Sequence, residues 1–390
     1  MKTDSHKDVG KNGPSILAWV RIVSFVYILL LGVGIISAGF SCAAGGKEGA
    51  ERIFAFATNP FMGLIMGIFA TALIQSSSTI TSVIVGMVAG GLPISIAVPM
   101  IMGANIGTTI TNTIVSLGHA RHKDEFRRAF AAATIHDYFN LLSVVIFLPL
   151  EVAFGLLEKC GALLTSLIAG TGPMSTHHLN FMKPITEPIV RFTFNLVHLL
   201  HINDIFIGII LVSIGLALIV GSITYIGRLM KIIMVGRAKK ILHAAIGRGP
   251  ITGIASGTAV TMIVQSSSTT TSLIVPLVGS GVFDIRKVYP FTLGANIGTC
   301  VTALLAATAI TGPLASAALQ IAFVHLLYNI IGVIVIYSIP HLRELPLKAA
   351  EIFAAIASER KSLAFAYIVT VFFIIPGAFM GIAILKLPTH

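Results

Sequence analysis

A short polar run that occurs twice decides the fold. The first copy reads Gln75-Ser76-Ser77-Ser78-Thr79-Ile80-Thr81-Ser82, and the second, displaced by 190 positions, reads Gln265-Ser266-Ser267-Ser268-Thr269-Thr270-Thr271-Ser272. Seven of the eight positions are identical. Each run interrupts an apolar stretch, 60–90 or 250–280, and leaves room for only two half-length helices. Irregular backbone at membrane depth is tolerated only where it lines a cavity, so the runs predict two broken re-entrant hairpins.

The composition places these hairpins in a membrane. Hydrophobic residues make up 55% of the 390 positions and charged residues only 11%, whereas a soluble domain carries about 25% charge. So few charges cannot cover a water-exposed surface, and we predict an all-α polytopic membrane protein. Amphipathic helices along the interface are expected at 153–170 and 345–358. Stretches long enough to span the bilayer lie at 16–40, 94–117, 129–150, 204–227, 288–310, 317–339 and 363–385.

The charge balance and the cysteines exclude other classes of protein. The 26 Lys and Arg outnumber the 15 Asp and Glu and give a net charge of +11. A nucleic-acid-binding domain would gather such an excess on one face, but here it lies in short loops between apolar runs, as membrane topology requires. The three cysteines are scattered and match neither a zinc site nor a disulfide framework. We therefore expect no cofactor and no nucleic-acid partner.

The similarity around the polar runs extends over a whole repeat. Four collinear matches at a nearly constant displacement indicate one unit present twice: a helix, a hairpin, an Asn-Ile-Gly helix and a His-xxx-Asn helix. The further matches are Gly103-Ala104-Asn105-Ile106-Gly107-Thr108 with Gly294-Ala295-Asn296-Ile297-Gly298-Thr299, His136 with His325, and Asn140 with Asn329.

The loops carry opposite charge in the two copies. Four basic residues lie between 121 and 128, whereas the equivalent loop around 310–316 has none. Six basic residues between 228 and 248 precede the second hairpin, whereas 47–52 before the first hairpin is balanced. Under the positive-inside rule, equivalent loops therefore lie on opposite sides of the membrane. The two repeats are predicted to be inverted.

These observations give a domain organisation. A cytoplasmic tail is expected at 1–15, the first transport repeat at 16–150 and an outer connecting segment at 151–203. The second, inverted repeat follows at 204–340, and residues 341–390 supply an amphipathic helix and a final span. The N-terminus is predicted inside and the C-terminus outside.

The hairpin tips are candidates for an anion site. Unpaired donors in hydrocarbon cost about 1–3 kcal/mol each, and the helix after each run offers free N–H groups and a positive dipole end. Two opposed tips would form a neutral cradle for an oxyanion. For any single serine, a bond to a backbone carbonyl or close helix packing is the structural alternative. The candidate anion-binding residues are Gln75, Ser76, Ser77, Ser78, Gln265, Ser266, Ser267, Ser268 and Thr269, supported by Thr79.

The Asn-Ile-Gly motifs are candidates for a cation site. Asn105 and Asn296 bring amide oxygens next to threonine hydroxyls, and nearby carbonyls would complete an oxygen-rich site for sodium. Close helix packing is the alternative role for the glycines. No Lys or Arg lies inside either hairpin, so a bound anion needs a co-bound cation.

Asp137 is the one carboxylate in the His-Asn helix, and its counterpart is Leu326. Carboxylates within spans are costly enough to indicate function, and we interpret Asp137 as a cation ligand. The alternative is that it reaches Arg127 and Arg128 at the interface. The candidate sodium ligands are Asn105, Thr108, Thr109, Asp137, Asn140, Asn296 and Thr299, with Gln75, Gln265 and Ser266 shared; Gly107, Gly298, His136, His325 and Asn329 support them.

Two further features have structural interpretations. His136 and Asn140 are four positions apart, as are His325 and Asn329, so each pair is expected on one face of its helix. Histidines such as these in a membrane act more often as structural hydrogen-bonding groups than as ligands. Glu187 and Arg191, four positions apart, are expected to form an ion pair in the outer segment.

The motifs together resemble the type II sodium-dependent phosphate cotransporters. The resemblance also includes Phe126-Arg127-Arg128-Ala129-Phe130 before His136-Asp137, and Ile185-Thr186-Glu187-Pro188, and it covers residues 20–385. It implies a sodium-coupled symporter for divalent hydrogen phosphate, with sodium as co-substrate and hairpin Gln and Ser residues lining both sites. In that family the acidic residue next to the His separates charge-moving members from electroneutral ones that have Gly. Asp137 therefore implies an electrogenic member.

The outer segment departs from the animal members of that family, which have a long glycosylated, disulfide-bonded loop and a further C-terminal span. Residues 151–203 are compact, which resembles a bacterial member in the inner membrane. The sequence leaves the oligomeric state open, and a homodimer is one arrangement that it allows.

Other functions are weighed against alternating-access symport with a site between the hairpin tips. A symporter for another oxyanion, or a passive anion channel, would use the same repeats and hydroxyl-lined hairpins. An intramembrane serine hydrolase would need a general base placed alike in both copies, for which only His136 and His325 qualify, and no oxyanion-hole elbow is visible. We therefore expect a transporter and not an enzyme.

Overall fold

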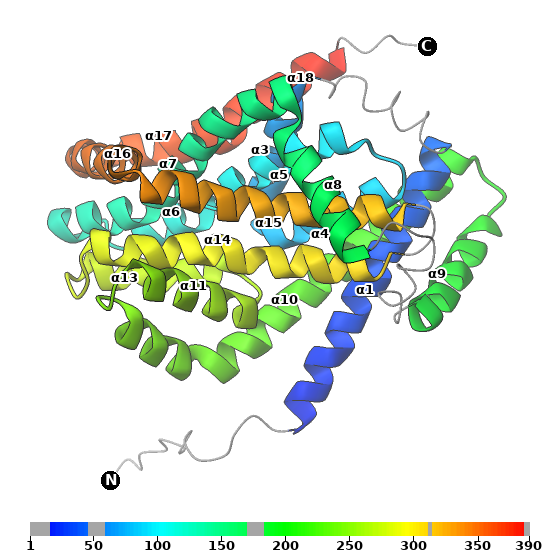
Figure 1. Cartoon of the computed structure of the whole chain (residues 1–390), viewed down its shortest axis with the longest axis horizontal. Coiled ribbons are helices and arrows are strands. Elements are labelled where there is room, and N and C mark those ends of the chain that lie inside the picture. Colours follow the sequence, from blue (N-terminus) through cyan, green and yellow to red (C-terminus); the bar gives the residue numbers. More distant parts are fainter. Residues whose placement is uncertain (1–15, 46–58, 170–182, 311–313, 386–390) are drawn as a thin grey trace.

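The structure is a computed structural model that describes residues 16–45, 59–169, 183–310 and 314–385, without the side chains of 169, 183, 231–245 and 383–385. The tail predicted at 1–15, the balanced charges at 47–52 and most basic side chains before the second hairpin lie outside the described residues. Every regular element described is a helix (Figure 1). The helices are α1 (Ile16–Ala44), α3 (Pro60–Ile74), α4 (Ser77–Ala89), α5 (Ile94–Gly107), α6 (Ile110–Leu117), α7 (Lys123–Phe154), α8 (Leu156–Ala169), α9 (Lys183–His198), α10 (Asp204–Ala245), α11 (Pro250–Val264), α12 (Ser267–Ser272), α13 (Ile274–Gly279), α14 (Ile285–Thr308), α15 (Ala315–Ser338), α16 (Pro340–Glu359), α17 (Lys361–Val369), η3 (Thr370–Ile374) and α18 (Ile375–Leu385).

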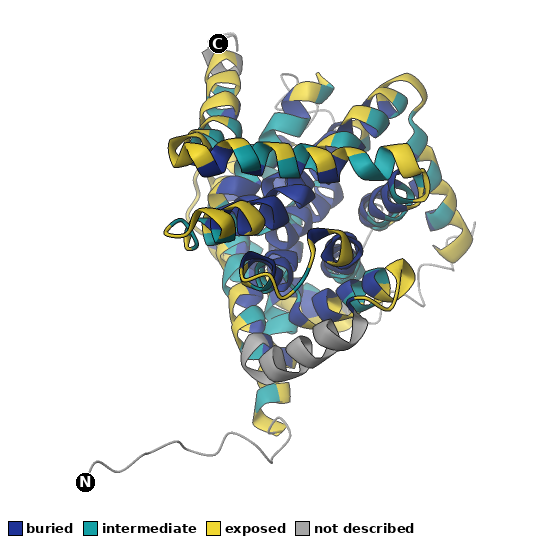
Figure 2. Ribbon diagram, turned by 90° about the vertical axis from the view of Figure 1, so that its left-hand side faces the viewer, coloured by how far each residue is buried: buried dark blue, intermediate teal, exposed yellow. Residues whose placement is uncertain are grey.

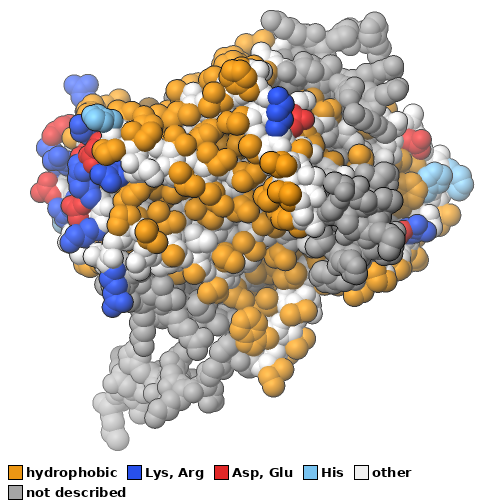
Figure 3. Space-filling model, viewed as in Figure 1, with side chains coloured by type: hydrophobic (Ala, Val, Ile, Leu, Met, Phe, Trp, Pro, Cys, Tyr) orange, Lys and Arg blue, Asp and Glu red, His pale blue; other side chains and the backbone are white. Residues whose placement is uncertain are grey.

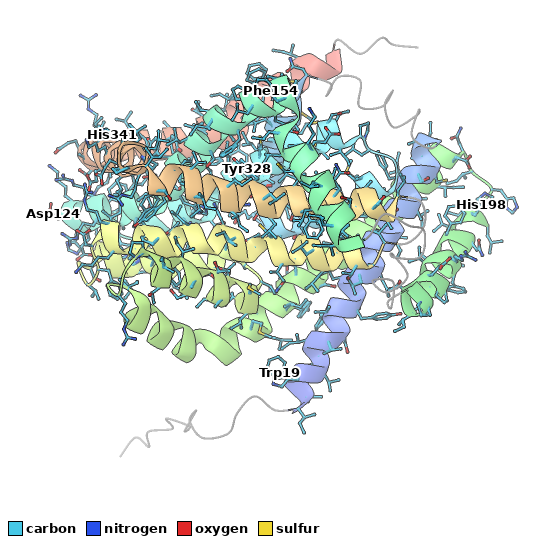
Figure 4. All side chains as sticks on the ribbon, in the orientation of Figure 1. Trp19, Asp124, Phe154, His198, Tyr328 and His341 are labelled. Atoms are coloured by element: carbon cyan, nitrogen blue, oxygen red, sulfur yellow. The ribbon has the colours of Figure 1, made fainter. Side chains whose placement is uncertain are left out.

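The all-helical membrane architecture is confirmed. Within the described residues, seven helical segments are long and apolar enough to cross a membrane, at the places that the sequence predicts. A broad apolar surface covers the visible face, and charged side chains gather most densely at one end of it, with fewer at the other (Figure 3). Asp124 and His341 mark that end, and His198 lies at the other (Figure 4). The segments predicted as amphipathic form the helices α8 and α16.

The helices that carry the motifs lie at the centre. In the most apolar part of Ile94–Leu117, 83% of the residues are buried, and in that of Ile285–Thr308, 72%. The last span, Lys361–Ile382, has only 22% buried and lies at the periphery. Figure 2 shows the same division, with buried helices inside a shell of exposed ones. The predicted site elements therefore form the core.

Glycines let the hairpins pack directly on the Asn-Ile-Gly helices. A Cβ at Gly103 would overlap the carbonyl oxygen of Leu64 on α3, and a Cβ at Gly294 would overlap that of Ile254 on α11. Small residues bring helix backbones this close in membrane proteins. Here α3 crosses α5, and α11 crosses α14, in the same manner.

The two halves differ in detail, which the motif matches do not reveal. The predicted span 94–117 is interrupted between Gly107 and Ile110, whereas α14 is continuous. The second limb of the second hairpin is interrupted at Leu273, whereas α4 is continuous. Pro276 stands where the first hairpin has Gly86, and proline lacks the N–H that a continuous helix needs.

The final span contains a π-helical turn. Residues Thr370–Ile374 form this turn between α17 and α18. Pro376 follows it and cannot donate to the carbonyl of Phe372, which its ring would also crowd. A wider turn accommodates both restrictions, and such turns are frequent at functional sites.

The hairpins open toward opposite ends of α7. A pocket of about 520 Å³ at the mouth of the first hairpin is lined by Pro60, Pro93 and, from the end of α7, Glu151. A pocket of about 500 Å³ at the mouth of the second hairpin is lined by Gly281 and, from the start of α7, Asp124. Since α7 is long enough to span a membrane, the two mouths lie on opposite sides of the protein core.

Candidate functional site

Each hairpin turns at its glutamine. Gln75 (φ 57°, ψ 30°) and Gln265 (φ 58°, ψ 23°) both adopt the left-handed conformation. Their N–H groups donate to the carbonyls of Thr71 and Thr261, each at 2.7 Å. This conformation costs a residue other than glycine about 1–2 kcal/mol. Glutamine at both turns therefore indicates that its side chain is needed there.

The first serine of each run begins the second limb of its hairpin. Ser76 Oγ accepts from the Thr79 N–H at 3.3 Å and from Thr79 Oγ1 at 2.8 Å. Ser266 Oγ accepts from the Thr269 N–H at 3.2 Å. These are helix N-caps. Each capping hydroxyl keeps its own proton, which it can donate to a ligand.

The last serine of each run joins one half of the molecule to the other. Ser78 Oγ donates to the carbonyl of Gln265 at 3.4 Å, so the two hairpin tips meet. Ser268 Oγ donates to the carbonyl of Thr108 at 3.3 Å, between α5 and α6. At these two positions the serine hydroxyl bonds to a backbone carbonyl, which is the structural alternative to binding an anion. The bond of Ser268 also brings the predicted anion-binding segment next to the predicted cation-binding segment.

The middle serines are the free ones. Ser77 and Ser267 are buried, and no hydrogen bond of either hydroxyl is found in the described part of the chain. Both stand in the first turn of a helix, where the backbone N–H groups also lack helical partners. This pair of hydroxyls and the adjoining N–H groups offer donors and no positive charge, which suits an oxyanion.

The two glutamine side chains are placed differently. Gln265 Oε1 accepts from Thr302 Oγ1 at 2.7 Å, and Gln265 Nε2 donates to the carbonyl of Met262 at 2.6 Å. Gln75 is exposed, and no side-chain bond of it is found among the described residues. The motifs did not indicate the contact with Thr302, although the equivalent position in the first copy is also a threonine, Thr111.

The asparagines of the two halves exchange hydrogen bonds. On one side, Asn105 Nδ2 donates to Asn329 Oδ1 at 2.9 Å, and His325 Nε2 lies 3.3 Å from Asn105 Oδ1. On the other, Asn296 Nδ2 donates to Asn140 Oδ1 at 2.8 Å. Each Asn-Ile-Gly helix thus bonds to the His-xxx-Asn helix of the other half.

His136 and Asn140 complete this network. His136 Nε2 bonds to Asn296 Oδ1, and Asn140 Nδ2 donates to the carbonyl of Asn105 at 2.8 Å. All the side chains of the network are buried. The predicted shared face of each His-xxx-Asn pair is therefore correct, and the structural interpretation of the histidines is observed. The amides that the sequence assigns to sodium bond to one another in this structure.

The threonines of the motifs keep oxygens available. Thr108, Thr109 and Thr299 donate to the carbonyls of the preceding helical turn at 2.8 to 3.1 Å. A hydroxyl that donates its proton retains lone pairs for a cation. Gly107 and Gly298 pack against the first hairpin limbs, where a Cβ would lie 2.7 and 2.6 Å from the carbonyls of Ile68 and Thr258.

Asp137 lies apart from the asparagine network. It is 4% exposed, its Oδ2 accepts from the hydroxyl of Tyr367 at 3.2 Å, and its Oδ1 is enclosed without a hydrogen-bond partner. Among the described residues it forms no ion pair. Arg128 instead donates through Nε to the carbonyl of Gly279 at 2.9 Å. A buried carboxylate without a counter-charge favours a bound cation.

Other contacts were not indicated by any motif. Asn112 Nδ2 donates to Thr271 Oγ1 at 2.8 Å, linking α6 to the second hairpin.

The expected ion pair between Glu187 and Arg191 is present on α9. That helix packs on α1, where the hydroxyl of Tyr27 donates to the carbonyl of Ile185 at 2.9 Å.

Comparison with known proteins identifies the family. The sequence model of the Na+/Pi-cotransporter family matches residues 28–172 and 218–386, which include both hairpins and every helix of the network. The chain belongs to this family. The sodium-dependent phosphate transport protein 2A of Ovis aries is 34% identical over 440 residues, covering 95% of this chain and 68% of the relative.

Two further relatives of this family give similar figures. The 2A protein of Oryctolagus cuniculus is 34% identical over 448 residues, covering 97% of this chain and 69% of the relative. The sodium-dependent phosphate transport protein 2B of Homo sapiens is 32% identical over 459 residues, covering 94% of this chain and 65% of the relative. No solved structure gives a significant match.

Proposed function

We propose that this protein is a secondary active symporter that uses an inward sodium gradient to take up inorganic phosphate as the divalent hydrogen phosphate ion. The observation that carries the proposal is the meeting of the two polar hairpin tips, Ser78 Oγ to the Gln265 carbonyl, next to the buried and uncharged side chains of Ser77 and Ser267. Membership of the Na+/Pi-cotransporter family and the names of the relatives support the same substrate pair.

The phosphate site is proposed between the tips. Phosphate oxygens would accept from the free hydroxyls of Ser77 and Ser267, from the remaining protons of Ser76 and Ser266, and from the first N–H groups of α4. The positive end of the helix dipole stabilises such an anion. The site supplies hydrogen-bond donors without a fixed charge. We assign Gln75 and Gln265 to its rim, because both residues form the turns of the hairpins in the left-handed conformation.

The sodium ions are proposed to neutralise the phosphate. Asp137 supplies the one fixed negative charge, and the threonine oxygens at Thr108, Thr109 and Thr299 supply neutral ligands near the tips. Oxygen atoms are the ligands that hard cations prefer. The amides of the asparagine network hold the two halves around this site. Because the Asp137 carboxylate would bind one sodium ion beyond those that neutralise the phosphate, each cycle would carry a net positive charge, and we propose that it is electrogenic.

Alternating access is proposed to follow from two inverted repeats, residues 16–150 and 204–340. Two observations support the inversion: the hairpins open toward opposite ends of α7, and the asparagine bonds are exchanged between the halves. A site between two such hairpins can be opened from either side in turn. We propose that the end marked by Asp124 and His341 (Figure 4) faces the cytoplasm, because the loops there carry the excess of basic residues.

The location of the protein is also a proposal. The loop charges put the N-terminus inside and the C-terminus outside, and the brevity of residues 151–203 relative to the animal members favours a bacterial inner membrane. A homodimer is compatible with the long exposed apolar face of the described helices.

Uptake by proteoliposomes tests the function. Radiolabelled phosphate should accumulate under an inward sodium gradient and should not accumulate when choline replaces sodium. Unlabelled phosphate should compete with the labelled ion better than sulfate does. Equal competition by sulfate would assign the protein to another oxyanion. Flux driven by voltage alone, without sodium, would identify a passive anion channel and contradict the proposal.

A further inference from the structure

The final span reaches into the proposed sodium site. Asp137 on α7 accepts a hydrogen bond from Tyr367 on α17, 230 positions away, at 3.2 Å. The segment that contains α17 belongs to neither repeat. A peripheral helix thus contributes a polar group to a buried carboxylate that forms no ion pair in the described structure.

Aromatic neighbours fix the position of the Tyr367 hydroxyl. The ring of Phe353 on α16 lies 4.9 Å from the ring of Tyr367, centroid to centroid, at 62°, and the ring of Phe372 lies 6.0 Å away at 85°. The ring of Tyr138 also lies edge-on to Phe353, 6.4 Å away between centroids at 83°. Edge-on packing of this kind is directional. Phe372 belongs to the π-helical turn, so the unusual turn helps to place the ring that supports Tyr367.

The two oxygens of the carboxylate have different surroundings. Oδ2 is occupied by the hydroxyl proton of Tyr367, whereas Oδ1 is enclosed and has no partner. An enclosed charged oxygen without a partner is strongly unfavourable unless a cation or water occupies it. The hydroxyl oxygen of Tyr367, having donated its proton, also keeps lone pairs. The pair therefore offers a cation one free carboxylate oxygen in a fixed orientation.

We infer that Tyr367 is a positioning residue of the sodium site: its hydroxyl holds the Asp137 carboxylate so that Oδ1 is free to bind sodium. This inference rests on the proposed sodium-coupled function. It adds the final span to the transport machinery and makes sodium affinity depend on a residue outside both repeats. The phosphate site at the hairpin tips does not depend on it.

The Tyr367→Phe variant tests the inference, because it removes one oxygen and keeps the ring. In proteoliposomes, the sodium concentration for half-maximal phosphate uptake should rise roughly tenfold, the effect of losing one hydrogen bond to a charged group. The phosphate KM at saturating sodium and the maximal rate should stay at the wild-type values. Tyr225→Phe, the same change on an exposed ring of α10, should leave all three quantities unchanged.

A double-mutant cycle separates positioning from a general structural effect. In the Asp137→Gly background, Tyr367→Phe should add nothing to the change in sodium dependence, because the group through which it acts is gone. Independent, additive effects would overturn the inference. Phe353→Leu removes the supporting ring and leaves both polar groups, so it should raise the half-saturating sodium concentration roughly threefold. This variant provides the test if the Tyr367→Phe protein fails to fold.

The outcomes distinguish this inference from the proposed function. If the wild-type protein takes up phosphate without sodium, the proposed function fails. If the wild type depends on sodium, and Tyr367→Phe and Phe353→Leu show the same sodium dependence as the wild type, only the role of Tyr367 is overturned.

Discussion

Ser78 Oγ donates a hydrogen bond at 3.4 Å to the backbone carbonyl of Gln265, 187 positions further along the sequence, and this bond joins the tips of the two hairpins. Each tip alone would be a polar break in an apolar segment. Together they enclose the free hydroxyls of Ser77 and Ser267 in the buried core. A ligand between the tips therefore contacts both halves of the chain at once, as alternating access requires.

Loss of a middle serine should weaken phosphate binding. Ser77→Ala or Ser267→Ala removes one donor from the proposed phosphate site, and the phosphate KM should rise roughly tenfold, since a hydrogen bond to a charged group contributes about 1.5–3 kcal/mol. Ser213→Ala, on the exposed face of α10, where the hydroxyl bonds only to its own helix, is the matched control. Unchanged KM values in both site variants would remove these serines from the phosphate site.

The turn glutamines should separate stability from activity. Glycine adopts the left-handed conformation without the steric cost that glutamine has there. The free energy of unfolding of the Gln75→Gly variant should therefore be about 1 kcal/mol higher than that of the wild type, or at least equal to it. Phosphate uptake should fall nonetheless, because the side chain at the tip is lost. The comparison needs melting curves of the detergent-purified protein and uptake rates of the same variant. Full uptake by the Gln75→Gly variant would show that the glutamine serves the backbone alone.

Asp137 should carry the charge of the transport cycle. Asp137→Gly removes the one buried carboxylate of the proposed sodium site, and uptake of phosphate should persist while the net current disappears. Solid-supported membrane electrophysiology measures the current, and radiolabelled phosphate measures uptake in the same vesicles. A current of wild-type size in this variant would contradict the electrogenic role of Asp137.

Glycines at the helix crossings should tolerate no side chain. Gly294→Ala would place a Cβ against the carbonyl of Ile254, so we expect a loss of about 1–3 kcal/mol in the free energy of unfolding. Gly221→Ala on α10 is the control, because nothing lies within 4 Å of the added atom. In a helix interior, alanine is more favourable than glycine by about 1 kcal/mol. A Gly294→Ala protein as stable as the control would refute the close crossing.

The sequence was sufficient to predict the helices and their motifs because both follow from local pattern. Apolar length predicts a span, and a polar run within an apolar stretch predicts a break, so the two Gln-Ser-Ser-Ser runs could be recognised as hairpin tips. The spacing of His136 and Asn140 placed them on one face without further information. Because the motifs occur in both copies, each of these predictions rests on two separate segments of the sequence.

The remaining features depend on contacts between segments far apart in the chain. Neither partner of the Asp137 to Tyr367 bond reveals the other, because Tyr367 lies outside both repeats and has no counterpart. The bond between Asn112 and Thr271 is hidden for the same reason: the position of Asn112 in the other copy is an alanine. Pro276 is the reverse case. The proline is plain in the sequence, but the repeated positions around it do not indicate that the helix is interrupted there.

The most direct test of the central claim is phosphate accumulation by proteoliposomes that contain either the wild-type protein or the Ser77→Ala, Ser267→Ala double variant, under an inward sodium gradient and with choline in its place. We predict accumulation above the external concentration only for the wild type with sodium. Accumulation by the double variant at the wild-type level, or by the wild type in choline, would contradict the proposed symport through the hairpin tips.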